Sequence, residues 1–73
     1  MLNKKHKITL INTNWEPIKT NLTVDVIPRT NELLYLVELG KYFEVVRVIH
    51  QLNKKQEIVI VISEFSTPVK KIN

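Results

Sequence analysis

The chain of 73 residues is long enough for one small domain, and it has no cysteine that could form disulfides or a thiolate zinc site. Its stability must therefore come from an apolar core, with self-association as a further source. Apolar residues make up 44% of the chain and charged residues 25%, which is typical of globular rather than disordered proteins. The formal net charge of +4 permits binding to an anionic surface without demanding it.

The types of apolar residue favour strands over helices. Isoleucine and valine dominate, alanine is absent, and there is one glycine. Because β-branched and aromatic side chains fit a pleated sheet, we expect a single all-β domain over residues 1–73. The sequence shows neither the apolar core of a signal peptide nor the apolar run of a membrane span. The lack of cysteine also suits a reducing compartment, so we predict a cytoplasmic protein that does not engage a membrane.

The first predicted strand covers Lys7–Asn12 and follows a polar start, residues 1–5, that we expect to be flexible. Residues 13–20 are predicted to form a connecting loop, because they combine turn-forming asparagine with Pro17. Trp15 lies in this loop and would serve as its aromatic anchor.

The second predicted strand, Asn21–Ile27, has the cleanest alternation in the chain. We expect Leu22, Val24 and Val26 to face the core while the polar residues between them face solvent. Pro28 has no backbone N–H to donate and therefore ends this strand.

The third predicted strand runs from Glu32 to Val37, after a turn over residues 28–31. A short helix over residues 31–39 is the alternative, because the leucines of this segment also fit one face of a helix. Gly40 can adopt positive φ without steric cost, so we predict a tight hairpin at this position.

The fourth predicted strand is the longest, from Tyr42 to Leu52. Its apolar alternation changes phase between Val45 and Val46, which predicts a bulge or a sharp bend. A long strand that bends strongly is how a small sheet curls toward a barrel.

The fifth predicted strand, Glu57–Glu64, follows a loop over residues 53–56 and is apolar on both faces from Ile58 to Ile62. Such a strand is central in its sheet, or a partner covers one of its faces. We therefore predict a five-stranded, strongly bent antiparallel sheet that forms a homodimer through the face or edge of this strand. The tail, residues 66–73, is predicted to be flexible.

No catalytic or cofactor-binding pattern is present in the sequence. The single glycine excludes the glycine-rich loops that bind phosphates and dinucleotides. His6 and His50 lie far apart, without a second metal ligand at helical spacing. The seven carboxylates form no close pair in the sequence of the kind that a hydrolase would need. We expect a protein that is not an enzyme and holds neither metal nor cofactor.

Three aromatic residues are candidates for contact with a partner protein. Trp15 is predicted in a loop, where an exposed indole often anchors an interface. The alternative is that Trp15 caps one end of a small barrel. Tyr35 and Tyr42 flank the predicted hairpin at Gly40 and are expected to form a cross-strand pair.

The basic residues support an alternative function, binding of single-stranded nucleic acid. Small barrels bind such strands through a basic groove with stacking aromatic side chains. Acidic residues on the same strands argue against this function. The basic candidates, which would serve a protein or a nucleic-acid partner, are Arg29, Lys41, Arg47, Lys54 and Lys55.

The order of features from Ile27 to Ile62 is similar to the order found in one protein family. In chain order these are a Pro-Arg turn that begins at Pro28, a short apolar strand from Glu32 and a glycine turn at Gly40. An aromatic-led strand from Tyr42, a lysine loop from Asn53 and a strand rich in isoleucine and valine from Glu57 follow. This order resembles the small SH3-like barrels of short accessory proteins of bacteria and their phages. Asn31 stands where the turn of that family usually has glycine.

The resemblance implies an SH3-like barrel and a binding role, and it transfers no specific site. Together with the composition, it predicts a non-enzymatic protein-binding accessory factor of bacterial or phage origin. An inhibitor of a host defence complex is one concrete version of this function. A nucleic-acid-binding small β-barrel is the alternative.

Overall fold

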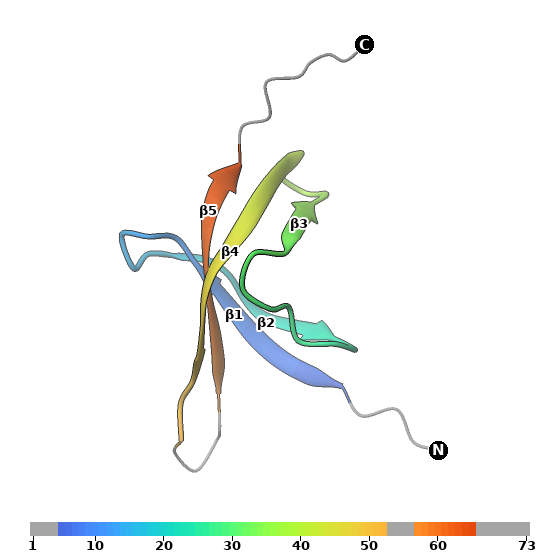
Figure 1. Ribbon diagram of the computed structural model, residues 1–73. Helices are drawn as coiled ribbons and strands as arrows, with labels where there is room; N and C mark the ends of the chain where they lie inside the picture. The colour runs from blue at the N-terminus through green and yellow to red at the C-terminus, as the bar shows by residue number, and fades with distance from the viewer. Residues whose placement is uncertain (1–4, 53–56, 66–73) are drawn as a thin grey trace.

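The computed structural model describes residues 5–52 and 57–65, and these residues form strands, turns and loops without a helix (Figure 1). The all-β prediction is therefore confirmed for this part of the chain. The helix alternative over residues 31–39 is wrong, because a strand occupies the middle of that segment. The predicted flexible ends, apart from Lys5, and the predicted loop over residues 53–56 lie outside the described residues. The strands are β1 (His6–Ile11), β2 (Pro17–Val24), β3 (Leu33–Leu36), β4 (Lys41–His50) and β5 (Ile58–Phe65).

The five strands form one sheet in the order β2-β1-β5-β4-β3. Three neighbouring pairs are antiparallel as predicted, but β1 and β5 run parallel, so the fully antiparallel sheet is wrong in this one pair and the sheet is mixed. The physical reason is that the chain forms two units, the β1–β2 hairpin and the β3–β4–β5 meander. Their docking places the first and last strands side by side, and no turn dictates the direction of that pair.

The sheet curls strongly into a half-barrel, and β4 runs along its whole length (Figure 1). The register of β4 against β5 shifts between Val45 and Arg47, which confirms the bulge or bend expected at this phase change. A bulge adds one residue to one strand of a pair and increases the local twist. It also brings Val45 and Val48 to the same face although they are three residues apart.

Strand β2 begins and ends earlier than predicted. Leu22 and Val24 pack against the core as expected, but Val26 lies beyond the end of the strand and is 78% exposed. The inward orientation predicted for Val26 is therefore wrong. The pairing of β2 with β1 shifts register between Leu22 and Lys19 and again between Lys19 and Pro17. Asn21, in the first of these stretches, has a φ of 56°. These irregularities bend β2, and the alternating pattern does not reveal them.

The core lies on the inner, concave side of the curled sheet. Its fully buried residues come from β1, β4 and β5, and the partly buried apolar residues of β2, β3 and the loop after β2 close around them. Strand β5 lies between β1 and β4, so its predicted central position is confirmed. The buried core residues are Ile8, Leu10, Phe43, Val45, Ile60 and Ile62.

Two turns depend on residues with positive φ. Gly40, at 65°, closes the β3–β4 hairpin as predicted. Asn31 has a φ of 78°, and its N–H donates to the Val45 carbonyl at 2.8 Å. Asn31 is thus in the left-handed region, and asparagine tolerates that conformation better than most residues. The Glu32 carboxylate accepts the Arg29 N–H at 2.8 Å and completes the turn.

Candidate protein-binding site

The loop between β1 and β2 is held by hydrogen bonds that converge on Asn12. The Asn12 Oδ1 accepts the backbone N–H groups of Asn14 and Glu16, each at 2.9 Å. The Asn12 Nδ2 donates to the Glu16 carboxylate at 3.0 Å. Two backbone bonds add to these: the Asn12 N–H donates to the Glu16 carbonyl at 2.9 Å, and the Trp15 N–H donates to the Asn12 carbonyl at 3.0 Å. The loop conformation is therefore fixed locally, before any partner binds.

This loop presents Trp15 to solvent. The residue has a φ of 64° and its side chain is 64% exposed. The alternative in which Trp15 caps the barrel is wrong, because the indole does not belong to the core cluster or to the residues packed against it. A bulky residue in the left-handed region is uncommon and costs on the order of 1 kcal/mol. The Asn12 hydrogen bonds hold that conformation in place.

A second aromatic group lies on the outer face of the sheet, the side opposite the core. Tyr35 on β3 is directly opposite Tyr42 on β4, and their ring centroids are 4.8 Å apart with planes tilted by 50°. The predicted cross-strand pair is thus confirmed. Phe65 on β5 is opposite Tyr42 and extends the pair to a row of three aromatic residues. Sequence reasoning missed Phe65, because only the β4–β5 register places it in this row.

The described basic candidates do not form a shared groove. Arg29 pairs with Glu32 at 3.9 Å, and Lys41 pairs with Glu64 at 3.3 Å. Arg47 is exposed on the outer face of β4. Lys54 and Lys55 lie outside the described residues.

The charge of the described part of the chain differs from that of the whole. Residues 5–52 and 57–65 contain six of the eleven lysine and arginine residues but all seven aspartate and glutamate residues. The net positive charge of the chain therefore comes from the remaining segments. The formal net charge of the described part is −1.

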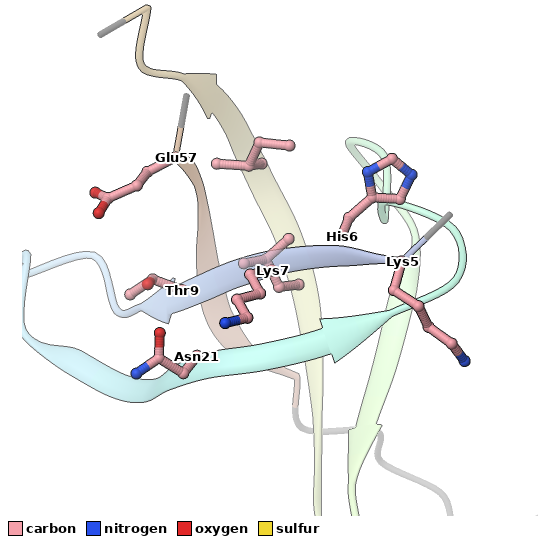
Figure 2. A pocket seen from close by; sticks show the side chains of 8 residues that line it. Lys5, His6, Lys7, Thr9, Asn21 and Glu57 are labelled. Carbon is pink, nitrogen blue, oxygen red and sulfur yellow. The ribbon is translucent and has the colours of Figure 1, made fainter. Parts of the chain in front are cut away.

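The clefts among the described residues are lined mainly by exposed and partly buried side chains. One is lined by Lys5, His6, Lys7 and Glu57 among others, and Figure 2 shows that these side chains fan out rather than converge. Another, larger cleft lies between the loop after β2 and β4, where Pro28 and its neighbours face His50. Within the described ranges no polar or charged side chain is buried, and no group of three or more potential metal ligands occurs.

The structure separates the predicted contact residues into two groups. Tyr35, Tyr42 and Arg47 lie on the β3–β4 side of the outer face. Trp15 lies in the loop between β1 and β2, and β5 separates these two strands from β4 and β3 in the sheet. Trp15 and the tyrosine pair therefore come from different strand pairs.

Comparison of the chain with models of protein families, with curated proteins and with solved structures finds no match. The curled five-stranded sheet agrees with a small barrel, while the resemblance to the SH3-like family stays a prediction. In the described ranges, no helix has the length and apolar character needed to cross a membrane.

Proposed function

We propose that this chain is a non-enzymatic protein-binding module whose anchor is Trp15. One observation carries the proposal: a tryptophan that is 64% exposed, with a φ of 64°, sits in a loop that five local hydrogen bonds hold in place. Tryptophan is among the residues that most often dominate the binding energy of an interface. An apolar pocket on a protein is the surface that fits an exposed indole.

The rigidity of the loop supports binding rather than simple surface exposure. Ordering a flexible loop on association reduces affinity, and a loop that is ordered beforehand avoids that loss. Left-handed backbone conformations at bulky residues persist only where the surrounding structure fixes them, and they gather at binding sites. Asn12 supplies that fixation here, while the indole itself is outside the core.

The non-enzymatic part of the proposal rests on the lack of a desolvated polar group. Catalytic acids, bases and nucleophiles are tuned by burial and by neighbouring charges. In the part of the chain that the structure describes, every buried side chain on the inner face is apolar. The setting we propose is that of a small cytoplasmic accessory factor of bacterial or phage origin. One concrete partner would be a host defence complex.

Nucleic-acid binding is the weaker proposal. Four of the six described cations, Lys5, Lys19, Arg29 and Lys41, already form ion pairs with carboxylates of the same chain. Those carboxylates would also repel phosphates. A mobility shift with single-stranded DNA and RNA at low salt tests this alternative directly, with Lys41, Arg47 and Lys54 as the positions to substitute.

The protein-binding proposal is tested by capturing a partner from the source cells, purifying it, and measuring its affinity for the wild type and for variants. We expect Trp15→Ala to weaken binding by about 30-fold or more, as for other anchor residues. Val26→Ala is the matched control, because Val26 is also exposed and lies in a different loop. Trp15→Phe should retain part of the affinity.

Two outcomes contradict the proposal. One is a Trp15→Ala variant that binds the purified partner as tightly as the wild type does. The other is a Trp15→Ala variant that has lost its circular-dichroism spectrum and cooperative unfolding, which would make Trp15 a structural residue.

A further inference from the structure

The outer face of β4 carries a symmetric pattern of side chains. Tyr42, Glu44, Arg47 and Ile49 lie opposite alternate residues of β5, namely Phe65, Ser63, Val61 and Val59. Alternate residues of a strand share a face, so all eight side chains belong to the outer face. The bulge makes Glu44 and Arg47 neighbours on this face although they are three residues apart in the sequence. Along β4 the order is therefore apolar, acidic, basic, apolar.

The two central charges of this pattern have no ion-pair partner among the described residues. None of the four ion pairs in the described ranges includes Glu44 or Arg47. Glu44 is half-buried and Arg47 is exposed. A carboxylate on a partly apolar surface is favoured when an opposite charge lies close to it.

The pattern is complementary to itself when it is reversed. A second copy that faces the sheet with its β4 antiparallel places its Arg47 over Glu44 and its Glu44 over Arg47. The same rotation places Ile49 of the second copy over Tyr42, so apolar side chains meet apolar ones. A two-fold interface requires this property. If one residue of the first copy contacts a second residue of the other copy, the same contact must also occur with the two copies exchanged.

We infer that a second copy of this chain packs on the outer face of β4 and β5. The contact would contain two reciprocal Glu44–Arg47 ion pairs, flanked by Tyr42 against Ile49 and by Phe65 against Val59. The surface is partly apolar, since Tyr42 is 48% and Phe65 is 36% exposed. Curved outer faces touch along a narrow band, so the interface is small and the dimer is weak.

The inference places the interface of the dimer expected from the sequence on a more specific surface. That expectation rested on the two apolar faces of β5, but Val61 is only 5% exposed and thus already covered by its own chain. The accessible apolar and charged groups belong to β4 and to the ends of β5. None of the eight side chains of the pattern belongs to the Trp15 loop, so the inference does not rest on the function proposed for that loop.

Charge reversal tests the inference without any knowledge of other partners. Sedimentation analysis of the full chain from micromolar to millimolar concentration should show a monomer–dimer equilibrium for the wild type. Arg47→Glu places like charges opposite each other at both ion pairs, and so does Glu44→Arg. Each variant alone should dimerise about 10- to 100-fold more weakly. An equimolar mixture of the two variants should regain the association, because every Glu then faces an Arg.

Two controls separate this result from other effects. Lys7→Glu makes the same change of charge at an exposed position outside the pattern, and it should leave the dimer intact. Trp15→Ala should also leave the dimer intact, so failure of this inference and failure of the proposed function are distinguishable. A wild type that remains monomeric at millimolar concentration would overturn the inference. Folded Arg47→Glu and Glu44→Arg variants that do not associate when mixed would overturn it as well.

Discussion

The amide of Asn12 is predicted to determine how rigidly Trp15 is presented. Asn12→Ala removes two acceptor contacts of 2.9 Å and one donor contact of 3.0 Å, and it leaves the two backbone bonds of the loop in place. A hydrogen bond contributes about 0.5–1.5 kcal/mol net, and these are exposed, so the loss should total about 1–2 kcal/mol. A domain of this length has a stability of about 4–11 kcal/mol, so the variant stays folded.

Asn12→Ala should affect the conformation of the loop more strongly than the stability of the fold. The left-handed conformation of Trp15 costs on the order of 1 kcal/mol, which is similar to what the Asn12 side chain contributes. Once that contribution is lost, the loop samples other conformations and the indole moves more freely. Trp15 is the only tryptophan, so its fluorescence anisotropy decay reports this motion without a label.

The matched control for this prediction is Asn14→Ala. Asn14 lies in the same loop, but it takes part in the network through its backbone N–H, which the substitution keeps. We expect faster anisotropy decay and a lower unfolding free energy in urea for Asn12→Ala only. If Asn12→Ala changes neither quantity, or if both variants change them equally, the Asn12 side chain does not hold the loop and this reasoning is refuted.

Two further predictions concern the fold. At Asn31, whose φ is 78°, Asn31→Val should be less stable than Asn31→Gly by about 1–2 kcal/mol, because a β-branched residue is strained in the left-handed region; equal urea midpoints would show that the turn does not require this conformation. Ile60 is fully buried between Leu10 and Val48, so Ile60→Ala should cost about 3–4 kcal/mol and Ile60→Val about 1 kcal/mol. A cost below about 1 kcal/mol for Ile60→Ala would contradict the central position of β5.

Much of the fold could be predicted because local patterns determine it. The phase change at Val45 and Val46 indicated the irregularity that the β4–β5 register contains. Gly40 indicated its hairpin, because only glycine adopts positive φ without cost. The apolar run from Ile58 indicated a strand with neighbours on both sides, and β5 has them.

The features that were missed depend on contacts between distant segments. The parallel pairing of β1 with β5 joins the first strand to the last, and nothing in either strand specifies the direction. Val26 continues the alternation of Leu22 and Val24, but β2 ends at Val24, which pairs with His6, the first residue of β1. Phe65 lies one residue beyond the predicted fifth strand, and only the register with Tyr42 brings it into the aromatic row.

The candidate sites lie on the side chains that the single curled sheet does not bury in its core. A chain of this length has enough residues to bury the inner face, and there every fully buried side chain is aliphatic or aromatic. The stability of that core does not require Trp15, Tyr35 or Tyr42, which all remain about half exposed or more. Exposed aromatic residues reduce solubility unless a partner covers them. The partner protein proposed for the Trp15 loop and the second copy inferred for the outer face of β4 and β5 would provide that cover.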